Sequence, residues 1–208
     1  MKGKFLILSI CLCINGSFNC AADSEVLKQP NTKEEKTDKL SAIEIKPTNV
    51  YVGAYINQIL EINFSEDYFV VDFWLWFRWE EPSKPGHFDL SKYNALEEFE
   101  LVDGIILDKS GDFTETSKTA KPKYKYQNIR VVGKFTKRFN MNSYPADNHD
   151  ISIKIEDSEH RTQKIKFVAD VEASNYSPNI QLPGWKVQVI QPRVDTVFYK
   201  SNFGNSEL

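Results

Sequence analysis

The chain has 208 residues, a length that suits one domain of medium size or one such domain with a tail. Its formal net charge is −3 at pH 7, and this mild acidity argues against a nucleic-acid partner. Its 14 Phe, 9 Tyr and 4 Trp favour a core built from β-sheet.

Residues 1–22 have the features of a signal peptide. Lys2 and Lys4 form a short basic region, an apolar run follows them, and small residues stand at Cys20 and Ala22. We therefore expect cleavage after Ala22 and export to the periplasm or the extracellular space. The apolar run, of roughly ten residues, is too short to span a bilayer. No later run is longer, so we expect no transmembrane segment in the mature chain.

Loss of this segment would change the chemistry available to the chain. All three cysteines, Cys11, Cys13 and Cys20, lie within it. The mature chain would form no disulfide and carry no thiol nucleophile or thiolate metal site. Two of the 26 basic residues would also go, leaving 24 against 29 acidic residues and a net charge of −5.

The next residues change from a polar leader to strands. Residues 23–48 are polar and charged with almost no aromatic residue, which predicts a flexible leader. Apolar and polar residues then alternate from Val50 to Phe64, as in a half-buried strand. A turn is expected at Ser65-Glu66-Asp67, and a second strand from Tyr68 to Trp79.

Short alternating segments continue to the end of the chain. They are centred on residues 129–139, 151–155 and 165–171 and on the stretch from Trp185, which we expect Pro192 to bulge or break. The polar stretch Lys109–Lys125 is interpreted as a mobile loop. Many short alternating strands without an amphipathic helix predict an all-β fold, an immunoglobulin-like β-sandwich over residues 49–208.

The second strand carries an unusual outer face. Its large apolar residues share one parity and are predicted to be buried, namely Val71, Phe73, Leu75, Phe77 and Trp79. The other parity holds Asp72, Trp74, Trp76 and Arg78. Tryptophans beside opposite charges are typical of an interface or a ligand site. The alternative is that a loop or the leader covers them.

Two further segments are distinctive. Phe139–Asp150 predicts a strand, then a compact loop with Pro145. Asp147, His149 and Asp150 in that loop are interpreted as turn-forming and capping residues rather than metal ligands. Tyr176–Trp185 contains two prolines and a glycine, which predicts an ordered crossover before the last strand.

In this order, the three segments resemble the extracellular ligand-binding domain of pentameric ligand-gated ion channels, the Cys-loop receptor superfamily. The resemblance is to the bacterial type without the flanking cysteines and covers Val50 to Tyr199. Trp79-Glu80-Glu81 stands at the family's Trp-x-Asp, and Tyr144-Pro145-Ala146-Asp147 at its signature loop. Leu182-Pro183-Gly184-Trp185 is similar to the segment before the family's ninth strand.

The resemblance implies a pentamer, here a homo-oligomer, that senses a small molecule at a subunit interface. One side of the pocket would hold Trp74, Trp76 and Arg78, and the other side Glu156, Asp157 and His160. Aromatic faces with acidic groups suit a cationic amine. The alternative for residues 156–160 is a solvated turn. Tyr144, Pro145 and Asp147 would form the signature loop that transmits gating to a membrane domain.

The sequence also departs from the family. The family's Trp-x-Pro-Asp loop is not recognisable between Phe99 and Lys123. The sequence ends at Leu208, before the family's final strand and membrane helices, so we expect a domain without its last strand and without a pore of its own. A gene fragment and a stand-alone soluble binding protein both fit this expectation.

We do not expect an enzyme, a cofactor or a metal site. The mature chain has His87, His149 and His160, but the sequence contains no nucleophile elbow, phosphate loop or paired metal-ligand spacing. A third possibility is an adhesin-like surface sandwich that binds protein.

Overall fold

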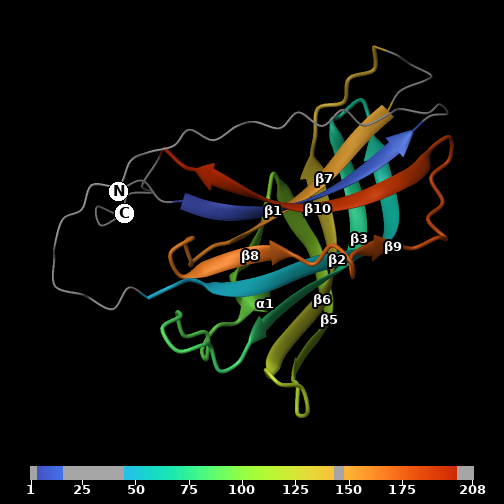
Figure 1. Cartoon of the computed structure of the whole chain (residues 1–208). Coiled ribbons are helices and arrows are strands. Elements are labelled where there is room, and N and C mark those ends of the chain that lie inside the picture. Colours follow the sequence, from blue (N-terminus) through green and yellow to red (C-terminus); the bar gives the residue numbers. More distant parts are fainter. Residues whose placement is uncertain (1–3, 16–44, 143–147, 201–208) are drawn as a thin grey trace.

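The computed structural model describes residues 4–15, 45–142 and 148–200. It consists of two β-sheets packed face to face, which confirms the predicted all-β sandwich (Figure 1). The first sheet has the strand order β10 (Lys186–Phe198), β1 (Lys4–Asn15), β7 (Asn148–Asp157), β4 (Phe99–Val102). The second has the order β5 (Gly104–Thr116), β6 (Tyr124–Thr136), β3 (Tyr68–Glu80), β2 (Thr48–Asn63), β8 (Ile165–Ala169). Strand β9 (Asn175–Tyr176) also pairs with β2, and α1 (Ala95–Glu98) precedes β4.

The β2–β3 hairpin forms at the predicted turn. The Asn63 side-chain oxygen accepts hydrogen bonds from the backbone N–H groups of Ser65 and Glu66. Asp67 adopts a φ of 57°, a left-handed conformation that aspartate tolerates better than most residues. Its carboxylate also accepts a hydrogen bond from the backbone N–H of Phe139. The turn therefore fixes the beginning of β3 against the segment that follows β6.

The predicted parity of β3 is confirmed. Phe73, Leu75, Phe77 and Trp79 are fully buried between the sheets. Trp74 and Trp76 lie on the opposite face, where both are partly exposed. The facing strand β7 buries Ile151, Ile153 and Ile155 in the same core. The alternation in sequence thus decides which face of each sheet is inside.

Three predictions about local structure are wrong. The stretch Lys109–Lys125 is not a loop: β5 runs to Thr116 and β6 begins at Tyr124. Strand β5 lies at the edge of its sheet and is largely exposed to solvent. It can therefore be as polar as a loop, and its sequence does not distinguish the two. Strand β2 begins at Thr48, within the predicted leader. Pro192 neither bulges nor breaks β10: it pairs opposite Ile10, since a proline is tolerated on an edge strand.

Some predicted features lie outside the described residues. These are the leader up to residue 44 and Tyr144, Pro145 and Asp147 of the predicted signature loop. Within the described part of the chain, no helix has the length and apolar character needed to cross a membrane.

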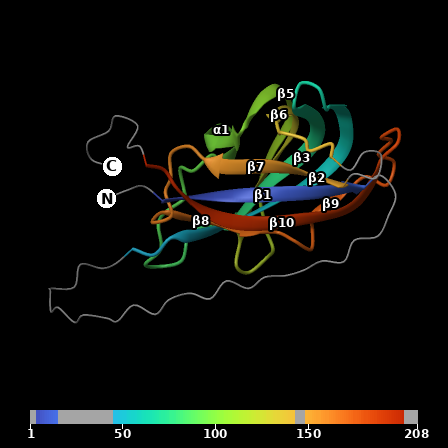
Figure 2. The same cartoon turned by 90° about the horizontal axis from the view of Figure 1, so that it is seen from above.

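The first strand comes from the predicted signal peptide. Strand β1 lies inside its sheet, antiparallel to both β7 and β10 (Figures 1 and 2). Leu8, Ile10 and Ile14 are fully buried and belong to the common core. Cleavage after Ala22 remains a prediction, and it would remove this interior strand.

Candidate functional site

The candidate site lies on the outer face of the six-stranded sheet, where β2, β3 and β6 run side by side. Arg78 pairs with Tyr51 of β2 on one side and with Tyr126 of β6 on the other. Directly opposed residues of antiparallel strands share a face of the sheet. These side chains therefore gather beside Trp76 on the surface that the sequence singled out.

Trp76 is held in place by its neighbours. Its indole N–H donates a hydrogen bond to a carboxylate oxygen of Asp170, at 3.2 Å. Its ring lies directly over Gly53: a Cβ atom at that glycine would stand 2.5 Å from the ring atom Cζ2. Only a residue without a side chain fits below the ring at this position. Gly53 and Asp170 together fix the orientation of the indole.

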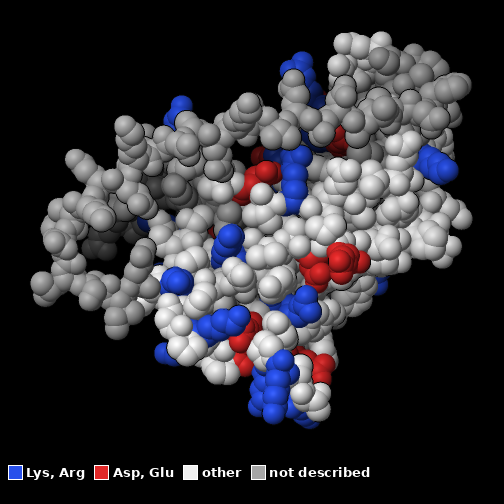
Figure 3. Space-filling model, in the orientation of Figure 1, with Lys and Arg blue, Asp and Glu red and all other residues white. Residues whose placement is uncertain are grey.

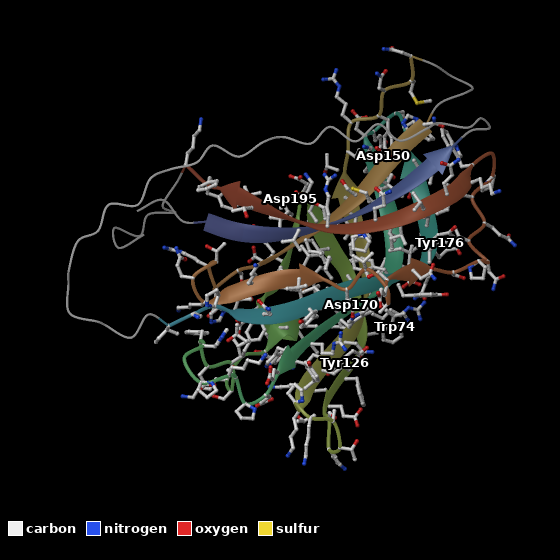
Figure 4. All side chains as sticks on the ribbon, viewed as in Figure 1. Trp74, Tyr126, Asp150, Asp170, Tyr176 and Asp195 are labelled. Carbon is white, nitrogen blue, oxygen red and sulfur yellow. The ribbon has the colours of Figure 1, made fainter. Side chains whose placement is uncertain are left out.

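Arg78 lies between two tyrosine rings. Its guanidinium carbon is 5.3 Å from the ring centroid of Tyr51 and 5.5 Å from that of Tyr124, within the range of cation–π attraction. The Arg78 Nη2 atom lies 3.5 Å from the same Asp170 carboxylate that accepts the Trp76 hydrogen bond. Asp170 thus connects an aromatic and a cationic group. Figure 4 labels Trp74, Tyr126 and Asp170, which belong to β3, to β6 and to the segment just after β8.

A hollow beside Arg78 extends toward the β5–β6 hairpin. It has a volume of about 440 Å³, in the range of small-molecule sites. Its lining comes from β3 and from the β5–β6 hairpin with its turn: Arg78, Glu115, Ser117, Lys118, Thr119, Ala120, Tyr124 and Tyr126. A second hollow on the other side of Tyr124 is lined in part by Tyr51, Lys84 and His87. Figure 3 shows lysine and arginine side chains gathered at this end of the molecule.

Tyr126 is one of the residues that line this hollow. Burial raises the pKa of Tyr126 above its ordinary value, and the Asp170 carboxylate acts in the same direction, while Asn128 and Arg78 oppose the shift. The phenol therefore remains protonated at neutral pH and can donate a hydrogen bond.

Trp74 differs from Trp76 because β5 approaches it. Gly111, with a φ of +62°, lies against the Trp74 ring: a Cβ atom there would stand 3.1 Å from Cη2. Nearby, Arg130 forms two hydrogen bonds to Asp72, at 2.9 and 2.6 Å, and Asn57 donates a third at 3.3 Å. These bonds, above all those from Arg130, lower the pKa of Asp72 against the opposing effect of burial. This end of the face is closed by contacts within the chain.

The second predicted group lies at the end of β7. Asp157 is buried and accepts a hydrogen bond from the Tyr93 hydroxyl at 2.8 Å and others from the backbone N–H groups of Glu159 and His160. The His160 Nδ1 atom lies 2.8 Å from the Glu98 carboxylate and 3.2 Å from that of Asp157. Burial raises the pKa values of Glu98 and Tyr93.

A cation could in principle use this cluster, since ligand atoms of Glu98, Asp157 and His160 lie within 4.8 Å of one another. Asp157, however, already uses both oxygens to hold the turn and Tyr93. Asp157 therefore acts as a buried cap that holds the turn after β7 in place.

The predicted ligand residues are not brought together within one chain. Glu156 faces away from Asp157 and accepts a hydrogen bond from the Tyr199 hydroxyl at 2.7 Å. Burial raises the pKa of Glu156 and outweighs that hydrogen bond. Asp157 and Tyr93 lie inside the sandwich, where Tyr93 contacts Trp79 with ring centroids 5.1 Å apart. The six-stranded sheet therefore separates this group from Trp74, Trp76 and Arg78.

Sequence reasoning missed four residues of the site: Tyr51, Tyr124, Tyr126 and Asp170. The alternation of Tyr124, Tyr126, Asn128 and Arg130 could have placed the β6 residues on the outer face. Asp170 follows β8, which pairs in parallel with β2, and that pairing gave no signal in the sequence.

A comparison of the chain with known protein families and with curated proteins finds no match.

Proposed function

We propose that this chain is an exported ligand-binding module of the pentameric ligand-gated ion channel type. In this proposal it senses a small molecule on the outer face of the six-stranded sheet, at an interface between copies. The observation that carries the proposal is Arg78, held between Tyr51 and Tyr124 beside Trp76 and Asp170. The β-sandwich is the scaffold that the proposal requires.

The geometry refines the class of ligand. A simple cationic amine would suit Trp76 and Asp170, but Arg78 already faces the two tyrosine rings and would repel it. A molecule that also carries a carboxylate could pair that group with Arg78 and Lys118, which line the same hollow. We therefore expect a zwitterionic amine to bind better than a simple cation.

Tryptophan fluorescence provides the test. Zwitterionic amines, simple amines and simple carboxylates are titrated into the exported protein, into Arg78→Met and into Trp76→Phe. Loss of a charge-assisted hydrogen bond of about 1.5–3 kcal/mol predicts a 10- to 100-fold weaker affinity for Arg78→Met. Arg193→Met is the matched control, because Arg193 lies in β10 of the other sheet with an exposed side chain. Equal effects of the two arginine changes would contradict the proposed site.

Native mass spectrometry over a range of concentrations tests the assembly. A five-fold ring supports a pocket formed between copies, with Trp76 and Arg78 of one copy facing the next; buried Asp157 could not take part in it. A monomer that binds none of the small molecules would contradict it.

The alternative is a stand-alone binding protein or an adhesin-like surface sandwich that binds protein. One observation favours a protein partner: the edge strand β5 exposes Ile105, Leu107 and Phe113, each with about half of its surface or more in solvent. Exposed apolar residues on a sheet edge are typical of protein contacts.

A further inference from the structure

We infer that the β5–β6 hairpin and the two hollows at its base bind an acidic polysaccharide, a chain of sugar rings that carry carboxylate or sulfate groups. This surface shares the hollow beside Arg78 with the small-molecule site proposed above, but it does not depend on that site binding an amine. Three features point to it: exposed lysines at the hairpin tip, two adjacent hollows that share one tyrosine, and acidic side chains among the basic ones.

The hairpin tip concentrates positive charge in a chain that is acidic as a whole. Residues 117–125 contain four lysines and no aspartate or glutamate. Lys125 turns inward, over a buried tryptophan ring. Lys118, Lys121 and Lys123 are exposed, and within the part of the chain that the structure describes none of them forms an ion pair. Figures 1 and 3 show the hairpin and the basic side chains around it at the bottom of the view. A short lysine-rich segment of this kind is typical of sites for polyanions.

Hydrogen bonds hold this tip in place. The Ser117 hydroxyl oxygen accepts a hydrogen bond from the backbone N–H of Ala120 at 3.1 Å. The backbone N–H of Ser117 donates to the carbonyl oxygen of Tyr124 at 2.8 Å, and that of Glu81, just after β3, donates to the carbonyl oxygen of Lys123 at 2.9 Å. The exposed lysines therefore extend from a supported turn, which lowers the entropy lost when several of them bind one partner.

Two hollows flank Tyr124 at the base of the hairpin, and Tyr124 lines both of them. Arg78 and Lys118 line the larger one, and Tyr51 and Lys84 line the smaller one. Each hollow thus combines an aromatic ring with a cation. A single small molecule fills one hollow, whereas a chain of linked rings can pass over Tyr124 and place a ring in each. The geometry therefore favours a polymer of rings.

The other side chains of this surface distinguish among the classes of polyanion. A lipid surface would favour large apolar residues at the tip, but Ala120 and Pro122 are the only apolar residues of the segment 117–123. The backbone of a nucleic acid offers only acceptors, and the carboxylates of Glu80 and Glu115 in the hollows would find no donor in it. Sugar hydroxyl groups donate to carboxylates, and the acidic groups of the same chain accept from lysine. An acidic polysaccharide fits both signs of charge.

The test uses the full chain with heparin and with polygalacturonate, followed by isothermal titration calorimetry. We expect both polymers to bind at low ionic strength and to bind less tightly as salt is added, because salt screens exposed charges. The double change Lys121→Gln and Lys123→Gln should weaken binding by about 5- to 30-fold. The matched control is Lys186→Gln with Lys200→Gln, since these exposed lysines lie at the two ends of β10 in the other sheet.

Other polyanions test the requirement for sugar rings. Inorganic polyphosphate, single-stranded DNA and vesicles of phosphatidylglycerol and phosphatidylcholine carry negative charge without acidic sugars. We expect each of them to bind more weakly than heparin at the same salt concentration. Tyr124→Leu keeps an apolar side chain on β6 but removes the ring that the two hollows share. It should therefore weaken the binding of heparin more than that of polyphosphate, and a thermal melt establishes that the variant is folded.

Three results would overturn the inference. The first is that neither heparin nor polygalacturonate binds at low salt. Equal losses for the two pairs of lysine changes would mean general attraction of charge rather than a site at the hairpin. Polyphosphate, DNA or vesicles bound as tightly as heparin would assign the surface to another class of partner. None of these variants changes Arg78, so the titrations of zwitterionic amines into Arg78→Met test the small-molecule site separately.

Discussion

At the scale of single residues, the tryptophans of β3 are expected to differ in how much they contribute to stability. Trp79 is fully buried against Tyr93, whereas Trp74 lies on the outer face. We expect Trp79→Ala to lower the free energy of unfolding by about 3–5 kcal/mol, because truncation of a buried aromatic leaves a cavity. Trp74→Ala should cost much less. Thermal and denaturant melts of both variants measure the difference, and equal losses would contradict the assigned faces.

The ion pair between Asp72 and Arg130 predicts a dependence of stability on pH. Hydrogen bonds from Arg130 lower the pKa of Asp72 in the folded chain. The ionised carboxylate therefore stabilises the fold above its ordinary pKa of about 4, and the contribution disappears as the pH falls through the lower folded pKa. The melting temperature of Asp72→Asn should lie below that of the parent at pH 7, and the gap should close in acid.

A surface pair provides the control for this experiment. The Lys154 Nζ atom lies 2.9 Å from Oδ2 of Asp103, and both side chains are substantially exposed. Asp103→Asn should change the melting temperature little at any pH, because exposed ion pairs add little stability. A gap for Asp72→Asn that persists unchanged at pH 2 would show that shape rather than charge is responsible.

At the scale of elements, β5 is the exposed margin of the six-stranded sheet. We expect the double change Ile105→Lys and Leu107→Lys to reduce self-association and binding to other proteins, because lysine on an edge strand opposes strand pairing. The melting temperature should change little, since both side chains are already exposed. Light scattering over a range of concentrations measures the association. Unchanged scattering would remove β5 as the protein-binding edge.

The strands differ in how much of them the sequence predicts. Strands β3 and β7 are half-buried on a hydrophobic core, so their alternation is strong and their faces follow from it. Strand β5 has one neighbour and no buried residue, so nothing selects apolar side chains at alternate positions. The sequence predicted the shared outer face of Trp74, Trp76 and Arg78, and their part in ligand binding stays a prediction. Asp170 was missed because it reaches Trp76 through tertiary structure, across 94 residues of sequence.

At the scale of the whole molecule, stability should depend on whether residues 1–22 are present. The chain made without export keeps β1, and we expect it to be monodisperse with a higher denaturant midpoint than the secreted form. The secreted form would expose unpaired strands of the first sheet, which recruit other chains. Size distributions and urea melts of the two forms provide the measurement. Identical midpoints would mean that β1 adds nothing to the fold.

The interior position of β1 also bears on the order of events in the cell. If residues 1–22 direct export, the same side chains that the core buries, Leu8, Ile10 and Ile14, must be accessible to the export machinery. Folding and secretion then compete kinetically for one segment. A chain that folds before it is exported buries its own export signal in the core. Delivery would depend on recognition of the segment while synthesis is still under way, or on a chaperone that delays closure of the sheet.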